Sequence, residues 1–463
     1  MNKEILRLAL PSILANITVP LVGMVDIAVA GHLDVSAAAL IGGISVGSLM
    51  FDMLYWNFGF LRAGTGGMTA QAFGREDWTE CKSLLFRGVG MALLASLLIL
   101  AIQWPFQKLM FVFVNCSEEV KSLALKYFYI RVWAAPATLS LMAVRGWFIG
   151  MQDTFSSMLT DVIVNGMNIL TSIFLALGIP GTGIRGVGYV GIAWGTVIAQ
   201  YTGLLFATGV VAIKYREKMM AADGNVPGRP SIPGNDSLRQ FFSVNGDLFV
   251  RSLCLMVVYL AFTAISARFG DVLLAMCSVM MKLMMIFSYF TDGFAFAGEA
   301  LTGRFIGMKR EDLLREEVRR TFAWSLGIGM LFVLVYWLGG MGMFRLMTSD
   351  TTVVDAAKDF LPWLVLMPLI GCPAFTWDGI FIGATATREL RDSTLGCVVS
   401  FFAIWCLGYL LFKPEGNGLV HLLFAAYYAH LIFRSLYLTA RYQSTVPLRA
   451  GLTGRPGGSR RNP

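Results

Sequence analysis

The chain has 463 residues, of which 56% are hydrophobic and only 14% are charged. Soluble globular domains carry roughly 25% charged residues, so this composition excludes a soluble enzyme or binding module and predicts a polytopic membrane protein. Basic loops on one side of a membrane explain the formal net charge of +8, so we expect no nucleic-acid partner.

Apolar runs separated by short polar turns follow one another along the chain, and each can cross a bilayer as a helix of about 20 residues. We predict twelve helices, at residues 8–30, 37–61, 87–112, 122–149, 155–178, 187–213, 243–267, 272–303, 320–344, 353–383, 394–412 and 419–440. The predicted fold is therefore all-α, with twelve transmembrane helices embedded in the lipid bilayer.

The first predicted helix carries a carboxylate, Asp26, and two prolines, Pro11 and Pro20, inside its apolar run. An acid within a bilayer is costly, and such acids commonly mark ion or proton pathways. Each proline removes a backbone donor and favours a kink or weak point. The run is too long for a cleaved signal peptide. We interpret it as a gating helix with a hinge; the alternative is a structural acid paired with a neighbouring donor.

The fifth predicted helix has a polar stripe. Its members are spaced i, i+4, i+7 and i+11, on one helical face: Asp161, Asn165, Asn168 and Ser172. Hydrocarbon would leave their donors and acceptors unsatisfied, so the stripe indicates a cavity lining. Structural hydrogen bonding between helices is the alternative. Thr196 and Gln200 form a smaller stripe of the same kind on the next predicted helix.

The second half of the chain repeats the first. GWFIG at 146–150 recurs as GIFIG at 379–383, an offset of 233, and the same offset places Thr69 and Gly74 on Thr302 and Gly307. Six helices in each half give parallel, pseudo-symmetric six-helix bundles, with a transport cavity expected between them. The predicted domains are an N-terminal bundle, a polar cytoplasmic linker, a C-terminal bundle and a basic, disordered tail: residues 1–213, 214–240, 241–440 and 441–463.

Lysines and arginines gather in the loops on the same side as the two termini. By the positive-inside rule, both termini are expected in the cytoplasm and the protein in the inner (plasma) membrane. The seven cysteines and three histidines are scattered, so the sequence predicts no disulfide framework and no metal site. Most of the methionines and phenylalanines are expected to face lipid or pack between helices.

Acids also lie in or near the apolar runs of the second half. They are Asp292, Glu299 and Asp378. Asp247 and Arg251, four residues apart, are predicted to form an ion pair on one helix.

Four motifs resemble those of the multidrug and toxic compound extrusion (MATE) transporters, in particular their DinF-like branch. They are MVDIAVAGHL (24–33), FLRAGTGGMTAQAFG (60–74), GWFIGMQDT (146–154) and NGDLFVRSL (245–253). The resemblance implies a V-shaped pair of six-helix bundles that exports small organic cations or other amphipathic compounds in exchange for H⁺ or Na⁺.

The resemblance also implies roles for single residues. Asp26 matches the family's first-helix aspartate, at which proton or sodium binding is linked to helix bending, and Asn165 and Asn168 match its paired asparagines. Family members with a proposed sodium site carry an aspartate where this chain has Ser172, which favours H⁺. Asp378 matches an acid of the tenth helix that some branches of the family use as a cation site, and with Glu299 it is a secondary candidate cation site.

The sequence favours a secondary-active antiporter over three other functions. A lipid-linked oligosaccharide flippase of the same superfamily would want a basic cavity, whereas the identifiable intramembrane charges are largely acids. A membrane enzyme lacks any catalytic constellation, so we predict no catalytic residues and no cofactor. A channel is disfavoured by the duplication, which suggests two rocking halves. We expect a monomer.

Overall fold

The computed structural model describes the whole chain except residues 34–36, 115, 180–183, 222–233, 349 and 450–463. The helices of the first half are α1 (Asn2–Gly31), α2 (Ala37–Trp56), α3 (Phe60–Gly74), α4 (Trp78–Phe113), α5 (Glu118–Arg131), α6 (Ala135–Gly150), α7 (Thr154–Leu177), α8 (Tyr189–Lys214) and the short α9 (Arg216–Ala221). Those of the second half are α10 (Gly234–Ser266), α11 (Asp271–Gly307), α12 (Glu311–Met347), α13 (Thr351–Gly383), α14 (Thr387–Phe412) and α15 (Asn417–Arg449).

Within the described residues, twelve helical segments are long and apolar enough to cross a membrane, which confirms the predicted fold class. Two of these segments are each built from two helices joined by a 3-10 turn, Asn57–Gly59 between α2 and α3 and Val132–Ala134 between α5 and α6. One feature was not predicted: strands β1 (Gly178–Ile179) and β2 (Ile184–Arg185) form a small antiparallel hairpin between α7 and α8.

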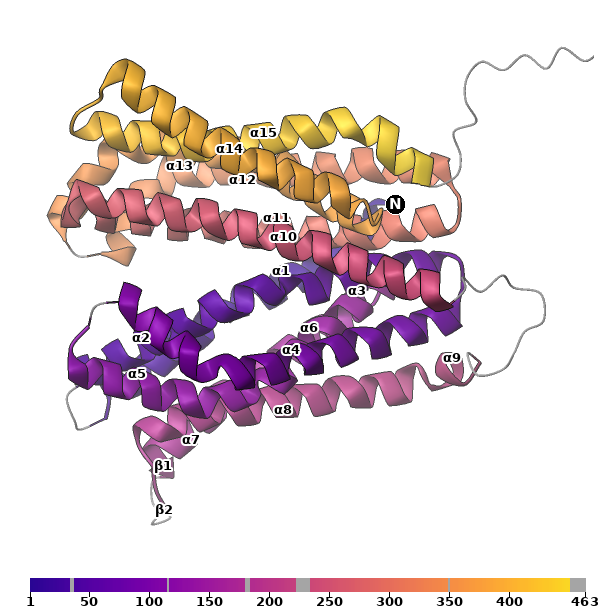
Figure 1. Ribbon diagram of the computed structural model, residues 1–463, viewed down its shortest axis with the longest axis horizontal. Helices are drawn as coiled ribbons and strands as arrows, with labels where there is room; N and C mark the ends of the chain where they lie inside the picture. The colour runs from indigo at the N-terminus through magenta and orange to yellow at the C-terminus, as the bar shows by residue number, and fades with distance from the viewer. Residues whose placement is uncertain (34–36, 115, 180–183, 222–233, 349, 450–463) are drawn as a thin grey trace, which may run out of the picture. The chain divides into compact units, whose positions relative to one another are not determined.

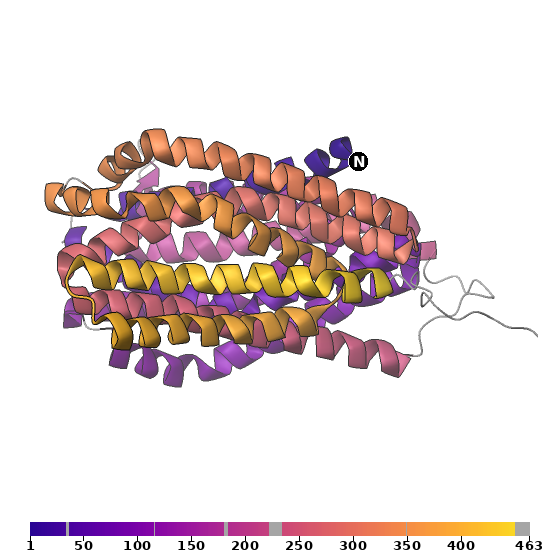
Figure 2. The same ribbon diagram turned by 90° about the horizontal axis from the view of Figure 1, so that it is seen from above.

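Two compact units make up the structure. The N-terminal unit comprises Leu14–Thr69 and Asp77–Ser231; the C-terminal unit comprises Met1–Ile13, Ala70–Glu76 and Ile232–Pro463. The two predicted bundles, 1–213 and 241–440, therefore differ from these units at the start of α1 and the end of α3. Inside the C-terminal unit, α14 and α15 pack side by side, and α11 packs along α13 (Figures 1 and 2).

The linker and the tail are more helical than predicted. Helix α9 and the first turns of α10 lie within 214–240, while 222–233 lies outside the described residues. Helix α15 continues to Arg449 because Tyr442 and Val446 are buried against the unit, so the disordered tail was wrongly predicted to begin at 441. The rest of that tail, 450–463, lies outside the described residues.

The duplication is confirmed by backbone geometry. Left-handed residues recur at the offset of 233, as Glu76 (φ 56°) with Lys309 (φ 55°) and as Gln152 (φ 61°) with Thr385 (φ 52°). Helices α4 and α12 begin 233 residues apart, and so do α7 and α14. The two halves therefore share the turns that join their helices as well as sequence motifs.

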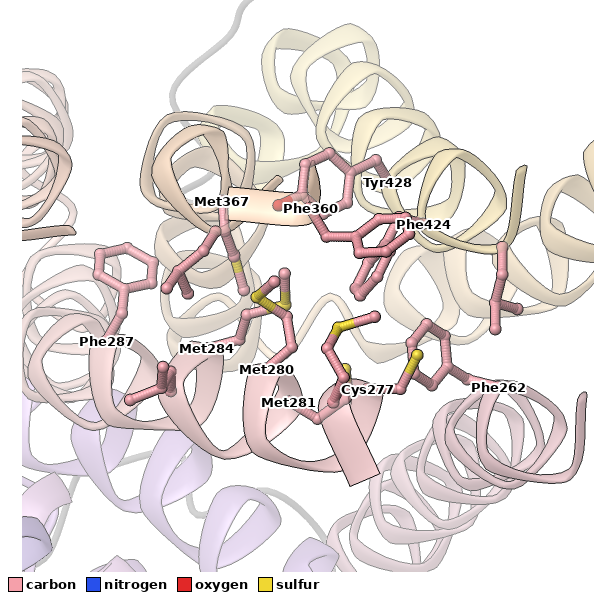
Figure 3. Close-up of a cluster of buried hydrophobic side chains, with 14 of the residues drawn as sticks. Phe262, Cys277, Met280, Met281, Met284, Phe287, Phe360, Met367, Phe424 and Tyr428 are labelled. Atoms are coloured by element: carbon pink, nitrogen blue, oxygen red, sulfur yellow. The ribbon is translucent and has the colours of Figure 1, made fainter. Parts of the chain in front are cut away.

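Methionine and aromatic side chains fill the core of the C-terminal unit. Figure 3 shows Met280 and Met284 of α11 beside Met367 of α13, with Phe360 and Phe424 near them. All five are essentially inaccessible to solvent. Flexible thioethers adapt to the irregular gaps between helices, so this part of the methionine set serves helix packing.

Candidate functional site

Asp26 lies in the part of α1 that belongs to the N-terminal unit, and only 4% of its surface is exposed. Two groups lie close enough to act on its carboxyl, the Ser172 hydroxyl of α7 and the positively charged Arg131 guanidinium at the end of α5. The Ser172 hydroxyl itself donates to the backbone carbonyl of Ile192 at 3.5 Å. Its Oδ1 atom is buried and accepts no hydrogen bond from the described residues. A buried acceptor of this kind can be satisfied by a bound proton or by a donor that enters the site.

Arg131 is held by aromatic groups as well as by acids. Its Nη1 donates to the Tyr127 hydroxyl at 3.1 Å, and its guanidinium carbon lies 4.8 Å from the Phe51 ring centroid. Asp52 also acts electrostatically on Arg131. Two acids, Asp26 of α1 and Asp52 of α2, therefore act on this guanidinium through their charges.

The two predicted asparagines of α7 form hydrogen bonds with the neighbouring helices α1 and α8. Asn165 Nδ2 donates to Thr18 Oγ1 of α1 at 2.7 Å, and Asn168 Nδ2 donates to Thr196 Oγ1 of α8 at 2.9 Å. The Asn168 Oδ1 atom is buried and has no hydrogen-bond partner among the described residues. The stripe on α7 therefore faces α1 and α8, and it brings hydroxyl and amide groups to the helix that carries Asp26.

Two predicted members lie apart from this group. Asp161 forms an ion pair with Arg145 of α6 at 2.6 Å, so its charge is already compensated. Asp161 is also about 16 Å from Ser172 along α7 at 1.5 Å rise per residue. Gln200 lies one turn beyond Thr196 on α8 and is half-buried.

The prolines do not interrupt α1, which is helical from Asn2 to Gly31. Pro11 is half-buried and Pro20 is exposed. The border between the two units falls between them, after Ile13. Hinge bending at these prolines therefore stays a prediction.

The second-half candidate, Asp378 of α13, is paired with two arginines, Arg251 of α10 and Arg434 of α15. Asp292 also acts on both guanidinium groups. Glu299 on α11 is fully buried. The described residues hold no group of three or more His, Cys, Asp or Glu side chains that could bind a metal ion.

The predicted ion pair between Asp247 and Arg251 was wrong. Asp247 instead accepts from Arg391 Nη1 at 2.7 Å and from Thr387 Oγ1 at 3.0 Å, both on α14. Arg251 reaches Asp378 on α13. Partners on neighbouring helices are favoured over a pair within α10, because a buried charge needs several hydrogen bonds and one i,i+4 neighbour does not supply them.

Sequence reasoning missed several charged residues inside the helices, among them Arg131, Arg434 and Glu317. Arg131 stands inside the predicted helix 122–149, so the rule that intramembrane charges are functional would have found it. Glu317 accepts hydrogen bonds from Thr302 at 2.9 Å and Thr321 at 2.8 Å and is fully buried. It lies just before the predicted helix 320–344, which is why the apolar run did not include it.

Comparison with known proteins covers nearly the whole chain. The family model described as MatE matches twice, over residues 11–174 and 248–411. The chain is 34% identical over 439 residues to DNA damage-inducible protein F of Escherichia coli (strain K12), covering 95% of this chain and 91% of that protein. It is 25% identical over 450 residues to a probable multidrug resistance protein NorM of Thermotoga maritima, covering 94% and 90%.

Solved structures share the fold at low sequence identity. A crystal structure of MATE in the bent conformation aligns with a TM-score of 0.81 and 17% identity over 97% of both chains. An outward-facing multidrug resistance MATE family transporter of the MOP superfamily aligns with a TM-score of 0.80 and 17% identity, over 98% of this chain and 97% of the other. The twelve-helix architecture is therefore that of a known group of transporters.

Proposed function

This chain belongs to the MatE family, and we propose that it is a secondary-active antiporter that exports small organic cations or amphipathic compounds in exchange for H⁺. It is a multi-pass membrane protein. We further propose a monomer in the inner membrane with both termini in the cytoplasm, since basic loops lie on that side.

The observation that carries the proposal is the buried carboxyl of Asp26 with its unsatisfied oxygen. Protonation cancels its charge, whereas ionisation leaves a carboxylate beside Arg131. Because charge changes cost so much free energy in a bilayer, each state favours a different arrangement of its surroundings. Binding of a proton can therefore shift the equilibrium between the outward-facing and inward-facing conformations, as alternating access requires.

Proton coupling is favoured over sodium coupling by what surrounds Asp26. Sodium prefers several hard oxygen ligands and gains from a second carboxylate, whereas a proton needs only one carboxyl group. The groups that act on Asp26 are the Ser172 hydroxyl and the Arg131 guanidinium. The first is a single weak ligand, and the second repels any metal cation.

A sodium site at Asp378 and Glu299 is the second candidate for coupling. It is less favoured because Asp378 is already paired with Arg251 and Arg434. The oligosaccharide flippase is likewise not favoured. Four arginines of the helical segments each lie near an acid, which leaves less positive charge for a pyrophosphate. The neighbours are Asp26 for Arg131, Asp161 for Arg145, and Asp378 for both Arg251 and Arg434.

The test uses proteoliposomes that contain the purified protein and a fluorescent organic cation. We expect export under an imposed pH gradient without sodium, and none under an imposed Na⁺ gradient at equal pH. Export driven by sodium alone would overturn proton coupling. Absence of export under either gradient, in correctly folded protein, would count against antiport of organic cations.

A further inference from the structure

A pocket of about 320 Å³ opens in the C-terminal unit, between the beginnings of α10 and α14, which pack on each other. Its walls include Arg239, Gln240 and Ser243 of α10 and Thr385, Thr387 and Arg388 at the start of α14. None of these residues belongs to the Asp26 site. The helices are labelled in Figure 1.

The pocket carries an excess of positive charge. Its one lining acid, Asp247, forms an ion pair with Arg391 and accepts a hydrogen bond from the Thr387 hydroxyl. Arg239 and Arg388 are exposed, and neither forms an ion pair with another residue in the described part of the chain. Two guanidinium groups and nearby hydroxyls are the donors that recognise a phosphate, because they supply both charge and directed hydrogen bonds.

The first half of the chain differs at the corresponding turn. Asp153 precedes α7 and caps it, accepting from the Ser156 backbone N–H at 3.3 Å. The residue 233 positions later is Ala386, and α14 has no side-chain cap. The second half therefore lacks the built-in carboxylate at the turn that borders this pocket.

Apolar residues continue from the pocket along the outer faces of both helices. On α10, Phe242 (62% exposed) and Phe249 (38%) follow Arg239, and on α14, Leu395 (46%) and Val399 (68%) follow Arg388. The spacings of three, four and seven residues keep them on the same faces as the arginines. In membrane-spanning helices these faces contact acyl chains, so a ligand at the pocket can combine a charged head with apolar tails.

We propose that the α10–α14 pocket binds the phosphate headgroup of an anionic phospholipid, whose acyl chains lie along α10 and α14. Basic pockets between transmembrane helices on the cytoplasmic side are suited to such headgroups. The ends of α10 and α14 that form the pocket lie on the side proposed as cytoplasmic. A free phosphate shares the headgroup chemistry but makes no use of the apolar faces.

The test measures the melting temperature of the purified full-length protein in a neutral detergent during titration with phosphatidylglycerol, phosphatidylcholine or inorganic phosphate. We expect saturable stabilisation by phosphatidylglycerol only. Arg239→Gln with Arg388→Gln should weaken the apparent affinity by about 25-fold, since one arginine near a lipid surface is worth about fivefold. Ser243→Trp, which fills the pocket without changing its charge, should weaken it as well.

The matched control is Arg319→Gln with Arg441→Gln, two exposed arginines of the same unit away from the pocket. This control should bind phosphatidylglycerol like the wild type. Equal losses in both double variants, or full affinity in Ser243→Trp, would show diffuse attraction rather than a site. Equal stabilisation by inorganic phosphate would overturn the lipid as ligand, as would equal stabilisation by phosphatidylcholine.

Discussion

At the scale of single residues, Asp26 is the group on which the proposed coupling depends. Asp26→Asn keeps the size and hydrogen bonding of the side chain but removes its titratable proton. We expect ion-driven export in everted vesicles to fall to background, while membrane insertion and the elution profile of the purified protein stay unchanged. Asp271→Asn, the same substitution at an exposed acid at the start of α11, should export normally. Wild-type transport by Asp26→Asn would refute the gate hypothesis.

Arg131 leads to a separate prediction about ion selectivity. Its positive charge acts on Asp26 and opposes the binding of a metal cation there. In Arg131→Gln this repulsion is lost, which should raise the affinity of the site for Na⁺ at least about tenfold, the equivalent of 1.4 kcal/mol. We therefore expect an imposed Na⁺ gradient to drive measurable export by this variant. Arg131→Lys keeps the charge and should stay insensitive to sodium. If the glutamine variant responds to sodium no better than the wild type, Arg131 does not set selectivity.

What the sequence could predict about these residues follows from the cost of polar groups in a bilayer. Asp26, Asn165 and Asn168 stand out because they interrupt apolar runs. The threonines that accept hydrogen bonds from the two asparagines, Thr18 and Thr196, do not stand out, because threonine is common in such runs. Of the two arginine partners of Asp378, Arg251 is 127 residues distant along the chain, and no local pattern connects two such positions.

At the scale of elements, the start of α7 shows how a turn is fixed by charge. Asp153, in the turn between α6 and α7, accepts from Lys214 Nζ at 2.7 Å and from the Tyr215 hydroxyl at 2.8 Å. Burial disfavours its charged form, but hydrogen bonds from Lys214, Ser156 and Tyr215 outweigh this effect and lower the pKa of Asp153 below its ordinary value. The turn is therefore stabilised when Asp153 is ionised.

A carboxyl whose pKa is depressed by folding adds stability above its unfolded pKa, near 3.9, and that stability is lost as the pH falls through the folded value. Asp153→Asn keeps a good helix cap but loses the charge. At pH 7 it should lower the free energy of unfolding by about 1–2 kcal/mol, as expected for charge-assisted hydrogen bonds.

The measurement is the melting temperature in detergent between pH 7 and pH 3. The gap between wild type and Asp153→Asn should close toward the acidic end. Asp350→Asn, which replaces an exposed cap at the start of α13, should cost less at pH 7. A gap of constant size across the range would mean that the charge of Asp153 contributes nothing.

Helix boundaries were the least predictable feature at this scale. The predicted helix 320–344 begins nine residues too late, since α12 starts at Glu311. Its first turns are charged and stabilised by i,i+4 pairs, Arg315 with Glu311 and Arg320 with Glu316. A search for apolar runs does not detect such charged turns, and for this reason the buried Glu317, which lies within them, was missed.

At the scale of the whole molecule, the duplication preserves backbone geometry while changing side-chain chemistry. Arg145 of α6 and Asp378 of α13 are 233 residues apart and carry opposite charges, and each is paired with acids or bases of its own half. Sequence repetition could therefore predict the shared fold of the two halves. It could not predict which half would carry the proposed ion coupling, because that depends on the residues that differ.

The clearest shared feature is a close approach of two helices, which recurs in both halves. A Cβ atom on Gly146 would lie closer than 3.0 Å to the backbone carbonyl oxygen of Arg62, and one on Gly379 would overlap the carbonyl of Ala295 in the same way. The glycines are 233 residues apart, and so are the carbonyls they meet. Because the obstacle is backbone rather than a flexible side chain, a helix must shift to admit a methyl group.

We therefore expect Gly146→Ala and Gly379→Ala to destabilise the protein to a similar extent, by about 1–3 kcal/mol each, the usual cost of overpacking. Gly90→Ala and Gly327→Ala are controls in the two halves, because nothing lies within 4 Å of a Cβ at either position. These should be neutral or slightly stabilising, since alanine favours a helix. The measurement is the melting temperature of each of the four purified variants, compared with that of the wild type. Destabilisation at only one of the two close approaches would show that the halves do not use this contact equally, even though their backbones repeat it.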